Sequence, residues 1–170
     1  LYNVEQVEIL RGPNALLFGR GGTGGIINRV SKKATLGETF GSVDFGLDSF
    51  GANDIAVDYN TGTSGDSAVR VMIHRDSLEN HRDHYDGTRL GFNPTIKIKM
   101  NESTTLDLSY EHADHERYID RGVPTENSEP VERFEKITFG GDDNLTTLKA
   151  NILRATLSKV FSDTRKGNLS

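Results

Sequence analysis

The residues that could do chemistry fall into two groups, and the first is a glycine-rich segment. Residues 19–25 read Gly-Arg-Gly-Gly-Thr-Gly-Gly, which contains the Gly-x-Gly-x-x-Gly spacing of dinucleotide-binding turns. Such a turn needs a strand before it and a helix after it, so that the pyrophosphate meets a helix N-terminus. The residues that follow, Ile-Ile-Asn-Arg-Val, are a poor start for a helix, and no Gly-Lys-Ser/Thr follows the glycines. The spacing therefore gives little support to a nucleotide-binding enzyme.

The second group consists of histidine and aspartate side chains, which could ligate a metal ion. Their spacing fits no compact site, and solvated loops explain them better, so we predict no protein-held metal. No nucleophile, base and orienting group can be assembled either, which predicts that the protein is not an enzyme and has no cofactor. The residues of this group are His81, Asp83, His84, Asp86, His112, Asp114 and His115.

The composition narrows the class of protein. A length of 170 residues is that of one ordinary domain, and a first residue that is not Met suggests a mature or internal fragment. The net charge of −5 implies no general affinity for nucleic acid, and the absence of cysteine excludes disulfides and zinc–thiolate sites. No apolar run is long enough for a transmembrane helix, whereas transmembrane β-strands would barely raise the mean hydropathy.

Six segments with a period of two are the elements that must position these residues. In each segment apolar residues alternate with polar ones, which is typical of strands with one apolar and one polar face. Together with the turns between them, they predict an antiparallel meander, and residues 165–170 resemble a seventh strand cut short. The six segments lie at residues 43–47, 55–59, 69–73, 96–100, 106–110 and 153–161.

The connections between these strands differ in length at the two ends of the sheet. Three short turns alternate with longer connections at residues 79–87 and 112–144, and only residues 48–54 form a short connection on that second side. This asymmetry is typical of outer-membrane barrels, whose apolar strand faces meet lipid. A soluble sheet with one wet face would explain the alternation but not the asymmetry. The short turns are residues 62–65, 101–103 and 162–164.

Aromatic residues near the short turns are compatible with an interfacial girdle, because Phe40, Tyr59 and Phe161 fall there. Six strands do not close a barrel of this kind, so we expect an open sheet. Ahead of it, residues 4–33 read as strand, Gly-Pro break, short helical turn, glycine loop and second strand.

This leading segment resembles the end of the plug domain of TonB-dependent outer-membrane receptors, and the strands after it resemble the first strands of their barrel. The resemblance therefore covers essentially the whole chain. Within the family, the chain is most similar to ferric-siderophore receptors, and Asp120-Arg121-Gly122-Val123-Pro124-Thr125-Glu126-Asn127 resembles a segment of catecholate-type members. The matching plug residues are VEQVEILRGP at 4–13, LFGRG at 17–21, GGIIN at 24–28 and SKK at 31–33.

The resemblance implies a mostly β fold in which residues 1–35 end a plug domain. Residues 36–170 would be the first six to seven strands of a transmembrane antiparallel barrel of about 22 strands, incomplete in this chain. It implies a location in the outer membrane of a Gram-negative bacterium, and a receptor that binds and imports a ferric siderophore without covalent chemistry. The implied partners are the TonB energy-transducing complex, the siderophore and outer-membrane lipid, and no nucleic acid. Two alternatives stay open: a family member that imports cobalamin, haem or a glycan, and a soluble β-rich binding domain.

The resemblance also suggests roles for individual residues. Phe18 and Arg20 flank the apex of a plug loop that faces the ligand, although a purely structural role is an equal alternative. Family members often carry Tyr at the position of Phe18, so a hydroxyl donor is missing here while ring stacking remains. Arg20 could attract an anionic chelate.

Further candidates lie at the base of the long connection and in the turn after the first strand. Tyr118 and Arg121 are candidate ligand contacts by analogy. Arg11 matches an arginine that takes part in an ionic contact between plug and barrel wall, and a solvated or capping arginine is the alternative. Four glycines are predicted to be structural, because they let the backbone turn or approach a neighbour closely: Gly12, Gly19, Gly24 and Gly25.

Overall fold

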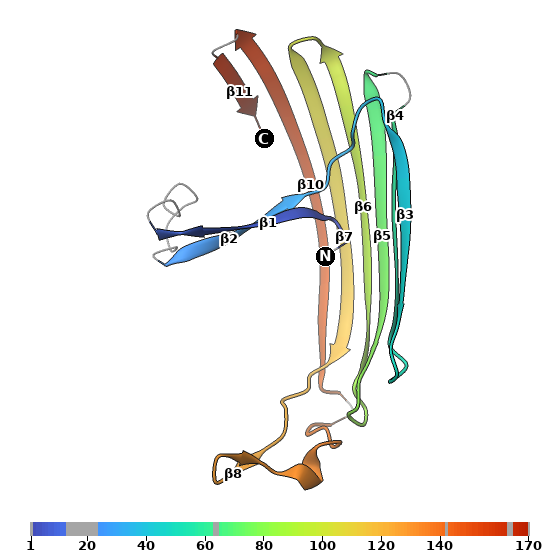
Figure 1. Ribbon diagram of the computed structural model, residues 1–170, viewed down its shortest axis with the longest axis vertical. Coiled ribbons are helices and arrows are strands. Elements are labelled where there is room, and N and C mark those ends of the chain that lie inside the picture. Colours follow the sequence, from blue (N-terminus) through green and yellow to red (C-terminus); the bar gives the residue numbers. More distant parts are fainter. Residues whose placement is uncertain (1, 13–23, 63–64, 142, 163–164, 170) are drawn as a thin grey trace.

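The computed structural model describes residues 2–12, 24–62, 65–141, 143–162 and 165–169. These residues form a long curved sheet and a two-stranded hairpin, which projects from the concave side of the sheet (Figure 1). The hairpin pairs β1 (Val4–Arg11) with β2 (Gly25–Ser31) in antiparallel register. In the described part of the chain, no helix is long and apolar enough to cross a membrane.

The large sheet has seven strands in the order β11-β10-β7-β6-β5-β4-β3, and every neighbouring pair is antiparallel. The predicted meander of six strands is thereby confirmed, and the segment that resembled a truncated seventh strand pairs with the sixth. The strands are β3 (Thr39–Leu47), β4 (Asn53–Gly62), β5 (Ser67–Glu79), β6 (Asp86–Asn101), β7 (Thr104–Tyr118), β10 (Leu145–Ser162) and β11 (Arg165–Leu169).

The strands are longer than a membrane crossing requires. The 18 residues of β10 span about 60 Å at roughly 3.4 Å per residue, whereas about 9–11 tilted residues suffice to cross the hydrocarbon. Within the described residues, β3 and β11 each pair on one side only, so the sheet is open at both edges.

One expectation about the long connection was wrong. Strand β7 continues through His112, Asp114 and His115 to Tyr118, so these residues belong to a strand and not to a loop. His112, Asp114 and His115 have ladder partners on both β6 and β10, and Tyr118 has one on β10. The polarity of these residues did not predict this pairing. The connection proper spans residues 119–144 and contains the short pair β8 (Thr125–Glu126) and β9 (Glu129–Pro130) and the 3₁₀ turn η2 (Glu132–Phe134).

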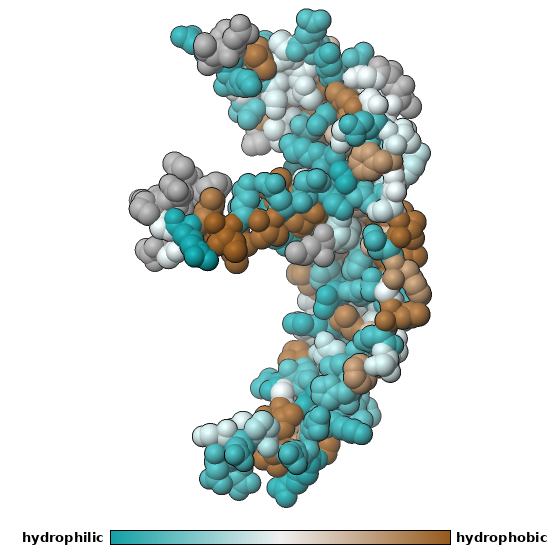
Figure 2. All heavy atoms as spheres, viewed as in Figure 1, coloured by the Kyte–Doolittle hydropathy of each residue, from teal (hydrophilic) through white to brown (hydrophobic). Residues whose placement is uncertain are grey.

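The two faces of the sheet differ in polarity. The register places Val57, Ile73 and Phe92 in one row across β4, β5 and β6, on the convex face. Figure 2 shows hydrophobic residues gathered along the convex, right-hand edge. The concave face instead buries polar groups beside a few apolar ones: Asn60, Arg70, Asn93 and Thr95, with Ala68 and Met72. An apolar convex face and a polar concave face are what a barrel wall requires.

The aromatic residues near the short turns are not equivalent. Tyr59 and Phe161 expose 50% and 66% of their surface. Phe40 turns to the concave side, where the Arg70 guanidinium lies 5.1 Å from its ring centroid. Phe40 therefore does not belong to a lipid-facing girdle, because it contributes to an inward cation–π contact.

Candidate functional site

The hairpin is a local structure that depends on glycine at one position. Gly25 has φ = +143°, and a Cβ there would lie 2.6 Å from the Leu10 carbonyl oxygen across the hairpin. Any larger residue would push the two strands apart, which supports the predicted structural role of Gly25. Gly12 has φ = +69°, in the left-handed region, whereas a Cβ at Gly24 would meet open space.

The segment after the hairpin is bound to the wall by a buried ionic group. The Asp58 carboxylate on β4 accepts two hydrogen bonds from the Arg70 guanidinium on β5, both at 2.7 Å. The same carboxylate accepts a hydrogen bond from Lys32 Nζ at 2.8 Å, and Arg70 also donates to the Lys33 carbonyl oxygen at 3.1 Å. Bidentate, charge-assisted bonds of this kind are strong and fix orientation. They hold residues 32–33 against the concave face.

Asn60 extends this contact along the chain. Its side chain is fully buried, and its Nδ2 donates to the carbonyl oxygens of Thr35 and Glu38 at 3.0 and 2.8 Å. Its Oδ1 accepts from the Thr35 N–H at 2.9 Å. A single amide thus takes the place of a neighbouring strand for residues 35–38, and its burial makes each bond costly to lose.

The residues before the hairpin contact the same face. Tyr2 stacks on His74, with ring centroids 5.3 Å apart and planes at 7°. A Cβ at Gly91 would lie 2.5 Å from the Tyr2 ring, so the glycine makes room for it. Burial raises the pKa of the Tyr2 phenol, and the negative charge of Glu111 acts in the same direction while Arg29 opposes it. Asn3 donates to Glu111 at 3.2 Å.

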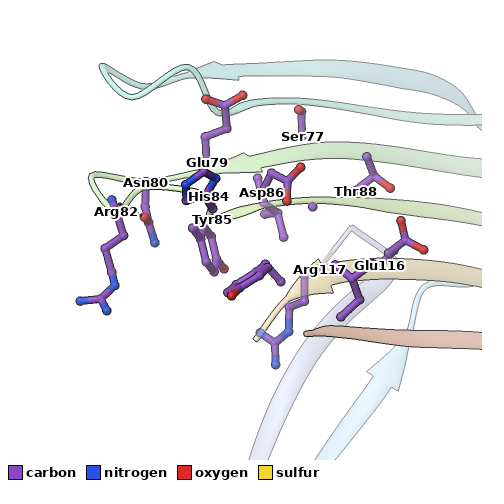
Figure 3. Close-up of a pocket in the computed structure, with 14 residues that line it drawn as sticks. Ser77, Glu79, Asn80, Arg82, His84, Tyr85, Asp86, Thr88, Glu116 and Arg117 are labelled. Atoms are coloured by element: carbon purple, nitrogen blue, oxygen red, sulfur yellow. Dashed lines mark hydrogen bonds between the residues drawn. The ribbon is translucent and has the colours of Figure 1, made fainter. Parts of the chain in front are cut away.

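A second feature is a polar cavity of about 670 Å³ at the end of the sheet that carries the long connections. Acidic and basic side chains line it together, and Figure 3 shows them at the ends of β5, β6 and β7 and on the turn between β5 and β6. Ser77, Thr88 and Glu116 share a register row on the face that carries Ile73. Other lining residues include Glu79, Arg82, His84, Tyr85, Asp86, Arg117 and Tyr118.

Arg82 organises the long connection from the turn between β5 and β6. Its side chain is 4% exposed, and its guanidinium donates to the carbonyl oxygens of Gly122, Glu135 and Ile137 at 3.1, 3.1 and 2.6 Å. Its Nε also lies 2.8 Å from the Asp120 carboxylate as an ion pair. Sequence reasoning missed this residue, because its acceptors are mostly backbone carbonyls 40 to 55 positions away and carry no side-chain signal.

Comparison with known proteins identifies the family and the fold. No protein-family model matches the chain. Over 94% of its length the chain is 31% identical to the metal-pseudopaline receptor CntO of Pseudomonas aeruginosa. Over 73% of its length it is 31% identical to a protein of Acinetobacter baumannii named "Probable TonB-dependent siderophore receptor PiuA". The chain belongs to the TonB-dependent receptors.

Solved structures of TonB-dependent receptors have the same fold. The open form of the ferric-catecholate import receptor Fiu from Escherichia coli matches 95% of the chain with a TM-score of 0.86 at 21% identity. The ferripyoverdine receptor of the Pseudomonas aeruginosa outer membrane matches 98% with a TM-score of 0.83 at 22% identity. The predicted fold class, a barrel wall preceded by the end of a plug, is thereby confirmed.

The chain is only a part of what its relatives contain. It covers 23% of CntO, 17% of PiuA, 27% of the Fiu chain and 23% of the ferripyoverdine receptor chain. As a TonB-dependent receptor, the protein is located in the outer membrane of Gram-negative bacteria. The family comprises receptors and transporters, which confirms the prediction that the protein is not an enzyme.

The predicted site residues of this TonB-dependent receptor lie in different places. Phe18, Gly19 and Arg20 fall outside the described residues. Arg11 ends β1 and is exposed, and within the described part of the chain it makes no ion pair. The ionic contacts with the wall that the structure does show are Lys32 with Asp58, Lys33 with Asp107 and Glu5 with Arg70.

Tyr118 and Arg121 are close in sequence but differ in their surroundings. Tyr118 is 5% exposed, and its hydroxyl donates to the Gly141 carbonyl oxygen at 3.3 Å. Because Gly141 lies in the long connection, this bond favours a role of Tyr118 in holding the connection. Arg121 is exposed and lines a small hollow with Phe139 and Asp143. Ligand contact by either residue stays a prediction.

Proposed function

We propose that this chain forms the junction between plug and barrel wall in a receptor that binds a ferric siderophore outside the outer membrane and imports it. The observation that carries the proposal is the hairpin docked on the polar concave face through Asp58, Arg70 and Lys32. A segment held inside a wall by hydrogen bonds and ion pairs can be released without unfolding the wall. The names of the relatives, which are receptors for siderophores and for metal–pseudopaline, support the same function.

We assign residues 1–35 to the end of the plug domain and residues 36–170 to the first strands of the barrel. The contacts support a boundary near this point. The Asn60 side chain binds the backbone of Thr35 on the plug side and the backbone of Glu38 on the wall side. The first wall strand, β3, then begins at Thr39. Energy delivered through the TonB complex would act on the plug side of this boundary.

The proposal assigns the convex face to outer-membrane lipid. Large apolar side chains there are substantially exposed, and a soluble domain would leave them in water. Val43 and Phe45 on β3, for example, expose 68% and 67% of their surface. This exposure argues against the alternative of a soluble β-rich binding domain.

Residue roles follow from the same proposal. Phe18 and Arg20 would face the external ligand from the plug, and Arg121 would face it from the long connection, with Tyr118 as a further candidate. Arg11 would contact a part of the wall beyond the strands of this chain. A guanidinium suits the anionic oxygens of a metal chelate, because it offers paired donors in a fixed plane.

A second candidate ligand is a complex of metal with a pseudopaline-like chelator. The relative that carries the metal-pseudopaline name matches 94% of the chain at 31% identity, whereas the catecholate receptor Fiu matches 73% at 28%. Nothing in the described residues favours cobalamin, haem or a glycan over these chelates.

The test is a deletion of the gene in its host, followed by growth and radiometal uptake under metal limitation. Cells receive a ferric catecholate, a ferric hydroxamate or a metal–pseudopaline complex as the only metal source. We expect uptake of one chelate to fall and to return with a plasmid copy of the gene, which also shows which chelate is used. Unchanged uptake of every iron and metal chelate would refute the proposal.

A further inference from the structure

Three potential metal ligands meet on the concave face, outside the group of Asp58, Arg70 and Lys32 and beside Tyr2. They are Asp54 on β4 and His74 and Asp76 on β5, and one ligand atom from each lies within 4.8 Å of the others. His74 Nε2 is already 3.2 Å from Asp76 Oδ1, close to the roughly 3.3 Å that separates two ligands of a tetrahedral ion with bonds of about 2.0–2.1 Å. All three residues project from strands inside the sheet, so their backbone positions are fixed.

The charges of this cluster are not balanced by protein. The register sets Asp54 directly opposite Asp76, and like charges in that arrangement destabilise a sheet. Asp76 has a partner in Arg89, whose Nη1 lies 3.5 Å from Oδ2. Asp54 has no hydrogen-bond or ion-pair partner among the residues that the structure describes. When the imidazole is neutral, one carboxylate of the cluster is therefore left without a compensating positive charge.

The surroundings hold the ligands in place. Tyr2 stacks on the His74 ring and fixes its plane, and Gly91 makes the space that the Tyr2 ring needs. On the other side, Gly46 leaves room for the Asp54 carboxylate, which a side chain at that position would displace. The ligand group is thus bordered by two glycines that let its neighbours approach.

We propose that Asp54, His74 and Asp76 bind one divalent transition-metal ion of the Zn²⁺ type, with water completing the coordination. One imidazole and two carboxylates are a donor set that such ions accept, and their ligand atoms already lie within 4.8 Å of one another. The ion supplies the missing positive charge between the two carboxylates. This site is held by protein side chains and is distinct from the metal inside a transported chelate.

A bound ion also has a structural consequence. It fixes the imidazole on which Tyr2 stacks, so it stabilises the position of the residues that precede the hairpin. The site therefore links the binding of free metal to the way the hairpin region sits against the wall. This link does not depend on which chelate the receptor imports.

The experiment measures Zn²⁺ binding to the whole receptor, purified from outer membranes in detergent and stripped with a chelator. Calorimetry of the wild type is compared with D54N, H74Q and D76N, and with D44N as a matched control. Asp44 is a carboxylate on the concave side of the neighbouring strand, and it lies outside the cluster. We expect each cluster variant to weaken binding at least ten-fold while D44N binds as the wild type does.

Absorption spectroscopy tests the site without any substitution. Co²⁺ added to the stripped wild-type receptor is expected to give visible bands of a nitrogen- and oxygen-ligated ion, and Zn²⁺ should remove them. The absence of such bands would overturn the proposal, as would cluster variants that bind Zn²⁺ as tightly as D44N does. Neither measurement uses a siderophore, so a negative result is distinct from a failure of the proposed transport function.

Discussion

The substitution D58N is expected to loosen the connection between hairpin and wall without unfolding the wall. Asp58 is the only carboxylate that binds both Arg70 and Lys32 within the described residues. An asparagine has the same shape as the aspartate but carries no charge. Its amide nitrogen is a donor, so it cannot accept a hydrogen bond from Lys32 or Arg70 as a carboxylate oxygen does. Lys32 loses its ion pair, and Arg70 loses one of the two bonds that orient it toward the Lys33 carbonyl oxygen.

The magnitude follows from the bonds that must break when residues 32–38 leave the wall. Lys32 and Asp58 expose 22% and 13% of their side chains, so we take the lower end for a charge-assisted bond, about 1.5 kcal/mol. Misorientation of Arg70 weakens its bond to the Lys33 carbonyl by roughly a further 0.5 kcal/mol. The sum, about 2 kcal/mol, corresponds to roughly a thirty-fold larger open population.

Hydrogen exchange of the whole receptor in detergent, read by mass spectrometry, measures this population. The backbone amide of Thr35 donates to Asn60 Oδ1, and the amide of Lys32 donates to the Asn3 carbonyl oxygen. Amides bonded in this way are protected, and they exchange when the segment opens. We expect their exchange to be about thirty-fold faster in D58N, with no change in β6 and β7. The matched control is D44N, which removes a concave carboxylate that takes no part in the contact. Equal exchange of residues 32–38 in the two variants would refute the reasoning.

Two further predictions concern the long connection and the N-terminal contact. R82Q is expected to make residues 119–144 roughly ten-fold more sensitive to protease, because it removes the guanidinium donors that join three backbone carbonyls of this connection. R133Q is the control, since the contact that the described residues show for Arg133 is its stacking on Phe134 of the same connection. Equal sensitivity of the two variants would contradict the role of Arg82. The raised pKa of Tyr2 predicts that its contact keeps its full strength below its ordinary value of 10.0 and is lost as pH rises through the raised value. An ultraviolet difference titration of the wild type against Y2F measures that shift, and an unshifted phenol would contradict the contact.

Much of the wall was predictable because alternation is a local property. Apolar residues two positions apart mark which face of a strand meets an apolar environment, and this needs no knowledge of the partner strand. Alternation assigned Val57 and Ile73 to the apolar face of their strands. It did not assign Phe92, which lies in the same row. The extent of β7 could not be predicted, because beyond His112 both faces are polar and the pattern ends although the hydrogen-bond ladder continues.

The candidate site was predictable only where a family resemblance named a residue. The resemblance pointed to Arg11, whereas the ionic contact that the structure shows is made by Lys32, Asp58 and Arg70. Phe40 was expected near lipid but lies against Arg70. In both cases the sequence contains the residue types that form the contact, but it does not show which of them lie side by side.

The amino-acid order alone thus determines the strands and their polar and apolar faces. It also determines the unequal length of the connections at the two ends of the sheet and the need for glycine in the hairpin. Each of these features depends on neighbours in sequence. Tertiary structure was needed to show which residues of the concave face meet. Asp54 contacts the region of His74 and Asp76, and Asp58 contacts Arg70, because strand register sets residues 12 to 22 positions apart side by side. A period of two specifies the face of the sheet on which a residue lies, but not which residues of neighbouring strands lie beside it. The contacts of this wall depend on those neighbours.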